Sequence, residues 1–157
     1  GTGSYITPDF AFPYGANFAE VAVNTRTGEI RLDKFYALLD CGTPVNPELA
    51  LGQIYGATLR AIGHSMSEEI IYDAEVTRNG DLRSYGAPKI GDIPRDFRAV
   101  LVPSDDKVGP FGAKSISEIG VNGAAPAIAT AIHDACGIWL REWHFTPEKI
   151  LTALEKI

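Results

Sequence analysis

Cysteine is scarce in this sequence, and its scarcity excludes several kinds of protein. The 157 residues include two cysteines, Cys41 and Cys136. Zinc sites and iron–sulfur clusters need closely spaced groups of cysteine and histidine, and these two residues lie far apart. A disulfide-rich secreted domain is excluded as well, although a single disulfide stays open. We therefore expect a reduced protein of the cytoplasm.

The sequence also has few basic residues and no long apolar segment. Lysine and arginine number 14 against 20 acidic residues, which gives a net charge of −6 at pH 7. Because no basic run is present to meet a phosphate backbone, nucleic acid is a disfavoured partner. No apolar run approaches the roughly 20 residues that a membrane helix needs, and no cleavable leader is visible. The chain starts on glycine, so we expect a start that was processed, tagged or cut from a longer chain.

Histidine offers little metal-binding chemistry here. His64, His133 and His144 are widely separated and follow no ligand spacing, so we expect surface or hydrogen-bonded histidines and no metal ligands from this chain. A phosphate loop is excluded by one residue, because its motif needs glycine directly before Lys-Ser/Thr and alanine intervenes between Gly112 and Lys114. The nucleophile-elbow motif of serine hydrolases is missing too. Nucleotide phosphate binding and serine-hydrolase chemistry are not predicted.

What the sequence does contain is a glycine- and proline-rich stretch with charges inside it, GPFGAKSISEIGVNGAAP at 109–126. Glycine allows the backbone to approach a ligand closely, and loops with little side-chain bulk can direct amide donors at an anion. Lys114 and Glu118 lie among small and apolar neighbours, where a poorly hydrated carboxylate can act as a general base. The alternative is that both are ordinary charges on a surface turn. Asp105 and Asp106, just upstream, are expected to form a solvated turn.

Hydrophobic periodicity and capping signals predict an α+β fold. Alternation over 17–23 and 29–39 predicts a β-hairpin. Asn46 and Pro47 are typical of the cap and first residue of a helix, which we expect over 47–69. Further expected elements are a short strand over 70–72, a strand over 98–102, a helix from about 123 to Gly137, a strand over 138–145 and a terminal helix from Pro147. With 45% hydrophobic residues the chain fits one globular domain, preceded by an irregular arm over 1–16.

The helix expected over 47–69 contains glycines that helices normally avoid. Gly52, Gly56 and Gly63 each cost it about 1 kcal/mol relative to alanine, which suggests close backbone packing or the approach of a ligand. Gln53 is the polar residue between Gly52 and Gly56, where the helix carries few side chains. It is either a ligand contact or a solvated glutamine near the start of the helix.

Five stretches of the chain together carry a family resemblance. They are DCGTPVNP at 40–47, GQIYG at 52–56, GPFGAKSISE at 109–118, APAIATAIHD at 125–134 and TPEKI at 146–150. In this order they resemble the C-terminal part of the molybdenum-binding subunit of the xanthine dehydrogenase and aldehyde oxidase family, the molybdenum hydroxylases. The similarity extends over about residues 18–154, and around 114–125 it is closest to xanthine dehydrogenase-like members. Residues 17–157 would then be a single C-terminal piece of a larger molybdopterin-binding architecture, with its strands packed against about three helices.

The resemblance implies a chemistry and a set of site residues. Members of that family use molybdenum held by a pterin dithiolene to hydroxylate a carbon beside a ring nitrogen, or an aldehyde carbon, with water as the oxygen source. Glu118 would be the general base that deprotonates the attacking oxygen. Gln53 and a loop would lie against the molybdenum-pterin cofactor, in its molybdopterin or dinucleotide form, and Lys114 would position the loop or the cofactor's anionic groups. The loop residues are Ala113, Lys114, Ser115, Ile116 and Ser117.

The sequence departs from the family pattern near the expected site. Ser117 stands where glycine is common before the glutamate, Ile119 where proline or a small residue is common after it, and Arg60-Ala61 where glutamine or histidine precedes glycine. These departures concern the substrate and the pocket shape more than the chemistry. They leave a non-catalytic scaffold or assembly module as the alternative function, and a small-molecule binder with the loop as an anion cradle as a third.

The resemblance covers only the last part of a subunit several times longer. It implies that the rest of that subunit supplies the remaining cofactor contacts, and that iron–sulfur clusters and FAD on other domains or subunits accept the electrons. The substrate would be a small molecule such as a purine-like heterocycle or an aldehyde. We expect the chain alone to be inactive.

Overall fold

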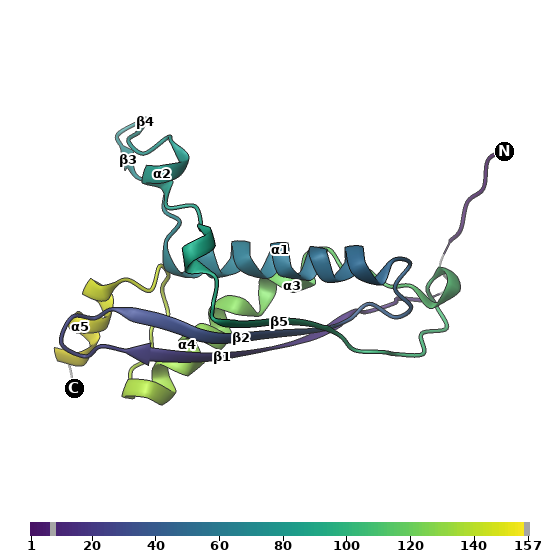
Figure 1. The fold of residues 1–157 in the computed structure, drawn as a ribbon. Helices are drawn as coiled ribbons and strands as arrows, with labels where there is room; N and C mark the ends of the chain where they lie inside the picture. The colour runs from purple at the N-terminus through teal and green to yellow at the C-terminus, as the bar shows by residue number, and fades with distance from the viewer. Residues whose placement is uncertain (7–8, 156–157) are drawn as a thin grey trace.

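The chain is built on a mixed three-stranded sheet. The computed structural model describes residues 1–6 and 9–155. Strands β1 (Tyr14–Val23) and β2 (Ile30–Asp40) form an antiparallel hairpin, and β5 (Asp96–Leu101) pairs with β2 in parallel, which makes β2 the central strand (Figure 1). The predicted hairpin is confirmed. Strand β1 starts inside the arm that was expected to be irregular, and Thr7 and Pro8 of that arm lie outside the described residues.

Helix α1 (Pro47–Met66) starts where its capping signal predicted. The Asn46 side chain accepts a hydrogen bond from the Leu49 amide at 3.0 Å, and proline occupies the first helical position, where a missing amide hydrogen costs nothing. The helix ends before Glu69, because the amides of Ser67 and Glu68 both turn back to the Gly63 carbonyl, at 2.8 and 2.9 Å. It connects β2 to the parallel strand β5, as a β–α–β crossover does.

The core lies between one face of the sheet and its helices. Helix α4 (Ala124–Cys136) packs on β1, while α1 packs on β5 and on α4, so both helices cover the same face (Figure 1). The largest side chains buried between them are Phe35, Leu39, Ile54, Ile128 and Ile132. Alternate strand residues point to the other face, where Phe18 and Val100 are exposed. The helices and the end of β2 therefore meet on the covered side of the sheet.

The segment between α1 and β5 projects from the body of the molecule (Figure 1). Its projecting part contains the two-residue strands β3 (Tyr72–Asp73) and β4 (Val76–Thr77) and helix α2 (Leu82–Tyr85), and the 3₁₀ helix η1 (Ile90–Asp92) then lies back beside α1. Asn79 holds this projection together, because its side chain accepts from the Ile71 amide at 2.8 Å and donates to two backbone carbonyls. The short strand expected over 70–72 is therefore displaced, and it pairs only within the projection.

The segment after α4 is not the strand that the sequence predicted over 138–145. Gly137 ends α4 with φ +77°, and the chain then runs without strand pairing to helix α5 (Pro147–Glu155). Ile138 and Phe145 are both buried, and the Phe145 amide donates to the Ser65 carbonyl of α1 at 2.9 Å. These two buried residues fix the segment against the helices instead of at a sheet edge, so the strand prediction is wrong.

The fold class that the sequence predicted is confirmed. The elements form an α+β domain whose longer helices are α1, α4 and α5, and the short helix α3 (Ile119–Asn122) precedes α4 directly. Over residues 1–6 and 9–155, no helix combines the length and apolar character needed to cross a membrane. The candidate site lies at the end of the sheet where β2 finishes and α1 begins (Figure 1).

Candidate cofactor-binding site

The glycine-rich loop extends the sheet beyond the end of β2. Two backbone hydrogen bonds join them: the Thr43 amide donates to the Gly112 carbonyl at 2.7 Å, and the Lys114 amide donates to the Cys41 carbonyl at 2.8 Å. Gly42 has φ +64°, and a Cβ there would lie 2.0 Å from the Gly112 carbonyl oxygen. Only glycine permits this approach, which brings the loop beside the start of α1.

A hollow of about 490 Å³ lies between this loop and the first half of α1. Its walls come from the end of β2, the turn before α1 and the loop itself. The lining residues are Cys41, Thr43, Pro44, Val45, Asn46, Leu49, Ala50, Gln53, Ala113, Lys114, Ser115, Ile116 and Ser117. Gln53 and residues 113–117, the cofactor-binding residues expected from the sequence, therefore surround one cavity although they are far apart along the chain.

Residues that line the hollow carry hydrogen-bond donors that the rest of the described chain leaves unused. The amides of Ser115 and Ile116 donate to no acceptor among residues 1–6 and 9–155, and the Gln53 side chain has no hydrogen-bond partner within those ranges. The side chains of Val45 and Leu49 are exposed and add apolar surface. Free amides beside apolar walls suit a flat heteroaromatic ligand that carries polar atoms at its edge.

Lys114 lines the hollow, but its charge is already neutralised by the protein. The ammonium donates to the Asp40 carboxylate and lies 3.9 Å from a carboxylate oxygen of Asp106. Its side chain is 4% exposed, and the Tyr14 ring centroid lies 5.5 Å from the nitrogen. The sequence left two roles open for Lys114. This geometry favours positioning of the loop, because the ammonium is buried and already paired with Asp40.

Asp40, the last residue of β2, is surrounded by donors. The Gly42 amide and the Ser104 hydroxyl donate to its Oδ1 at 2.8 and 2.5 Å, while Lys114 donates to its Oδ2. Burial by itself raises the pKa of Asp40, but the hydrogen bonds from Lys114, Ser104 and the Gly42 amide outweigh it and hold that pKa below the ordinary value. Asp40 is therefore a buried anion stabilised by its neighbours.

Asp106 is not the solvated residue that the sequence suggested. Its carboxylate accepts hydrogen bonds from the amides of Val108 and Gly109, at 2.8 and 3.0 Å, and its side chain is 15% exposed. The amides of Gly109 and Val108 hold the pKa of Asp106 below its ordinary value. The residue organises the start of the glycine-rich loop and faces the ammonium of Lys114.

Glu118 is not among the residues that line the hollow. It directly follows Ser117, which does line the hollow, and it is exposed. It also precedes α3, where its carbonyl accepts from the Val121 amide at 2.9 Å. The expected shielding of this carboxylate by the glycine-rich loop is therefore absent from the part of the chain that the structure describes. The structure instead puts Glu118 one residue beyond the lining residue Ser117, with its side chain exposed.

The three glycines of α1 have different surroundings. A Cβ on Gly63 would lie 2.5 Å from Pro88, so close packing explains that glycine. A Cβ on Gly52 or on Gly56 would meet nothing within 4 Å, and both residues are exposed. Packing does not explain these two, and they leave a bare helix surface beside Gln53.

Sequence reasoning missed the residues beneath the loop. Asp40 and Ser104 were given no role, and Cys41 was considered only for metals and disulfides. Cys41 lines the hollow, and burial raises the pKa of its thiol. One signal could have found Asp40: it ends an apolar strand, and a carboxylate in that position needs a cation or several donors as partners.

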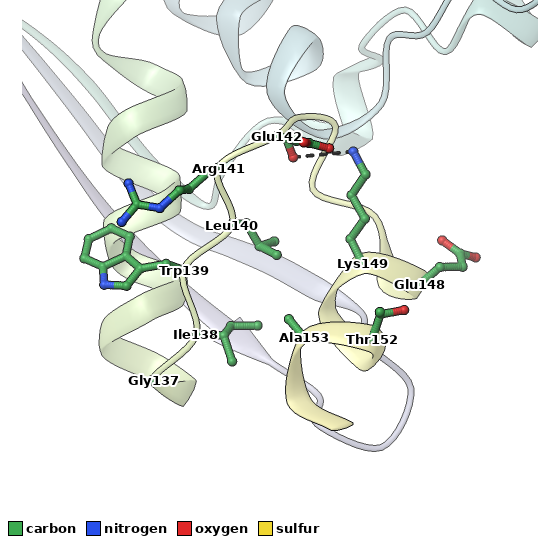
Figure 2. Close-up of a pocket in the computed structure, with 10 residues that line it drawn as sticks. All are labelled: Gly137, Ile138, Trp139, Leu140, Arg141, Glu142, Glu148, Lys149, Thr152 and Ala153. Atoms are coloured by element: carbon green, nitrogen blue, oxygen red, sulfur yellow. Dashed lines mark hydrogen bonds between the residues drawn. The ribbon is translucent and has the colours of Figure 1, made fainter. Parts of the chain in front are cut away.

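A larger hollow, of about 610 Å³, lies near α5 at the other end of the molecule (Figures 1 and 2). Figure 2 shows the segment after α4 on one side and α5 on the other, with Lys149 donating to the Glu142 carbonyl at 3.4 Å. Arg141 and Trp139 lie side by side and away from α5, with the guanidinium 5.9 Å from the ring centroid. None of the predicted site residues lines this hollow.

The histidines pack against aromatic rings. His64 and His144 have ring centroids 6.2 Å apart, and His133 stacks on Trp139 at 4.2 Å. Burial lowers the pKa of His144. Within the described ranges, no three or more His, Cys, Asp or Glu side chains are grouped so that they could hold a metal ion.

The fold and the hollow agree with what a comparison with known protein families shows. Residues 1–94, which contain the hairpin, α1 and Gln53, match the molybdopterin cofactor-binding domain family, and the chain belongs to that family. The matched range ends before the glycine-rich loop, so the relatives of the loop are found through comparisons over longer parts of the chain.

These comparisons show that the chain is similar to particular molybdenum proteins. It is 96% identical over 160 aligned positions to the probable hypoxanthine oxidase XdhD of Escherichia coli strain K12, covering 100% of the chain and 16% of that protein. It is 32% identical over 146 residues to PaoC, the aldehyde oxidoreductase molybdenum-binding subunit of the same strain, covering 92% of the chain and 20% of PaoC. The structure of the aldehyde oxidoreductase from Desulfovibrio gigas matches with a TM-score of 0.82 and 34% identity, over 91% of the chain and 15% of that enzyme.

These matches confirm the resemblance to the molybdenum-binding subunits of xanthine dehydrogenases and aldehyde oxidases. The chain spans 16% and 20% of the lengths of the two curated relatives. The activity of a complete protein that contains this chain is therefore a matter for proposal.

Proposed function

We propose that this chain forms one wall of the active site in a molybdenum hydroxylase, with Glu118 as the general base. The observation that carries the proposal is the hollow lined by Gln53, Ser115 and Ile116, in which the amides of Ser115 and Ile116 have no acceptor among residues 1–6 and 9–155, with Glu118 directly following the lining residue Ser117. Membership of the molybdopterin cofactor-binding family supports the cofactor. The rest of the subunit, supplied by other residues, would enclose the other side of the site.

The donor set of the hollow fits a molybdenum-pterin cofactor. The side-chain amide of Gln53 and the amides of Ser115 and Ile116 would donate to the acceptor atoms of the pterin, and Leu49 would contact its ring. When bound, the cofactor supplies two-electron oxidation chemistry, with water as the oxygen source. Lys114 would hold the loop while its charge stays with Asp40, so the hydrogen bonds to the cofactor would come from neutral groups of this chain.

Glu118 would take the proton from the oxygen nucleophile so that the oxygen can attack the substrate carbon. For this task the carboxylate needs a less hydrated setting than it has here, because loss of water raises its basicity, and the remainder of the subunit would provide it. The substrate class would be a purine-like nitrogen heterocycle or an aldehyde. The name of the 96% identical relative, a probable hypoxanthine oxidase, favours the heterocycle. Electrons would leave through iron–sulfur and flavin domains or subunits, in a cytoplasmic enzyme.

The test replaces the proposed base in the complete, cofactor-loaded enzyme. Glu118→Gln keeps the size of the side chain and removes its basicity, so turnover should fall about 10²- to 10⁴-fold, the usual loss for a general base. Glu75→Gln, at an exposed carboxylate in the projection, is the matched control and should leave turnover unchanged. Molybdenum content measured on the same samples separates lost catalysis from lost cofactor. A loss smaller than about tenfold at Glu118 would disprove its role as base.

A non-catalytic scaffold or assembly module is the second candidate. The exposure of Glu118 favours it, together with Ser117 and Ile119 in place of the residues that are common beside the family's glutamate. The two candidates make opposite predictions for the Glu118→Gln experiment. A scaffold would bind its partner proteins equally well with glutamate or glutamine at position 118, and the assembled protein would show no substrate oxidation to lose.

A further inference from the structure

One buried charge cluster lies directly under the glycine-rich loop. Lys114 has a side chain that is 4% exposed, and its two carboxylate neighbours, Asp40 and Asp106, are 12% and 15% exposed. Other ion pairs of the sheet lie at the surface, such as that between Lys34 and Glu20, whose side chains are 46% and 58% exposed. Surface pairs contribute little to a fold, whereas a buried pair is strongly destabilised when one partner is lost.

The polar contacts of the cluster are made to the protein itself. The Asp40 carboxylate receives the Lys114 ammonium, the Ser104 hydroxyl and the Gly42 amide. The backbone of the same lysine donates to the Cys41 carbonyl at 2.8 Å. The lysine therefore connects the loop to the end of β2 through both its backbone and its side chain.

This connection lies close to Glu118 along the chain. Lys114 precedes Glu118 by four positions, and the residues between them, Ser115, Ile116 and Ser117, are lining residues of the hollow. On the other side of Glu118, the Gly120 carbonyl accepts from the buried Thr58 hydroxyl of α1 at 3.3 Å. The backbone at Glu118 thus lies between one fixed point on β2 and a second on α1.

We propose that the Asp40–Lys114 ion pair is a positioning device, which fixes the free amides of the loop and Glu118 relative to the cofactor. The proposal rests on the proposed function of Glu118. Asp40 and Lys114 are positioning residues in this proposal, since their charged groups are paired with each other and would act through the loop. An error of about 1 Å in the placement of a catalytic group can cost a hundredfold in rate, so an anchor this close to the base should affect turnover.

The test is a double-mutant cycle in the complete, cofactor-loaded enzyme. Asp40→Asn keeps the shape of the side chain and removes the charge that holds Lys114. We expect kcat to fall roughly 10- to 100-fold in the otherwise wild-type enzyme, and less than about twofold in the Glu118→Gln background, because a base that is missing cannot be misplaced. An equal loss in both backgrounds, or no loss in either, would overturn the proposal.

A readout that is independent of activity follows the loop directly. Hydrogen exchange at the amides of Thr43 and Lys114, which form the two bonds between the loop and the end of β2, should become faster in Asp40→Asn and stay unchanged in the control Lys34→Gln. Unchanged exchange in Asp40→Asn would show that the ion pair does not fix the loop. Molybdenum content is measured in each variant, so that kcat is expressed per loaded site.

A second variant and a separate readout distinguish failure of this proposal from failure of the proposed function. If Asp40→Asn does not fold, Ser104→Ala removes one hydrogen bond to Asp40 and leaves the charges in place, and the same cycle is expected with a loss of about threefold. No dependence on the Glu118 background in that cycle would contradict the proposal. If Glu118→Gln alone leaves turnover unchanged, the proposed function fails. The exchange rates then decide by themselves whether the pair anchors the loop.

Discussion

At the scale of single residues, one glycine decides how closely the loop can approach the end of the central strand. Gly42 combines φ +64° with a position where a Cβ would be 2.0 Å from the Gly112 carbonyl oxygen. An alanine there would meet both the strain of the left-handed region and a steric clash. The glycines of α1 give the opposite case, since a Cβ on Gly52 would enter open space.

We expect Gly42→Ala and Gly52→Ala to change stability in opposite directions. Gly42→Ala should lower the free energy of unfolding by about 2 kcal/mol or more, from backbone strain and overlap with the loop. Gly52→Ala should raise it by about 1 kcal/mol, because alanine in an exposed helix position loses less backbone entropy than glycine. Urea unfolding of both variants and the wild type checks this pair. A stabilising Gly42→Ala would contradict the close approach of the Gly112 carbonyl to position 42.

The buried carboxylate of Asp40 should make stability depend on pH. Its pKa is held below the ordinary value in the folded chain. Its contribution is therefore complete above the unfolded pKa of about 3.9 and is lost as the pH falls through the lower folded value. We expect Asp40→Asn to be less stable than the wild type by about 3 kcal/mol at pH 7, and this difference to shrink below about pH 4.

Denaturant unfolding at pH 7, 5, 4 and 3 measures that difference. Asp73→Asn is the control, since Asp73 forms an exposed ion pair with Arg78 and its replacement should have little effect at any of these pH values. A difference between wild type and Asp40→Asn that stays constant over the whole range would show that the charge of Asp40 is not responsible.

At the scale of elements, local signals predicted the helices better than the last strand. Asn46, Pro47 and Gly137 act through contacts with their own neighbours in sequence, so the ends that they mark were predictable. The segment over 138–145 has apolar and aromatic residues typical of a strand, but it pairs with no strand among residues 1–6 and 9–155. Buried contacts with the helices decide its path, and no local pattern reveals them.

The contact between α3 and α1 gives a prediction at this scale. A Cβ on Gly120 would lie 2.9 Å from the Cβ of Ala57, so Gly120→Ala should push α3 away from α1 and move the adjacent Glu118. We expect a loss of stability of about 1–3 kcal/mol, typical of overpacking. The double variant Gly120→Ala/Ala57→Gly restores the space and should recover part of the loss, apart from the roughly 1 kcal/mol cost of a helical glycine. Thermal unfolding of both variants measures this. An equal loss with and without Ala57→Gly would argue against the contact.

The sequence grouped residues that the structure brings together, but it missed their interactions. Gln53 and the loop over 113–117, named as candidate cofactor-binding residues from the sequence, line one hollow, and their role there stays a prediction. The partnership of Lys114 with Asp40 and Asp106 was not predicted, because Asp40 lies in a different part of the chain and an acid in a polar loop looks solvated. Parallel pairing of β2 with β5 brings these segments together, and such pairing leaves no local mark in the sequence.

At the scale of the whole molecule, the two walls of the hollow come from segments separated by the projection and by β5. The hairpin of β1 and β2 forms from segments that are adjacent in sequence. The cavity forms only when residues 112–114 bond to residues 41–43 at the end of β2, far earlier in the chain. Contacts of large sequence separation form late, because closing long loops costs entropy before any contact compensates it. In the proposed enzyme the hollow would therefore exist only once residues 41–53 and 113–117 have come together, so we expect insertion of the pterin to follow folding of this domain.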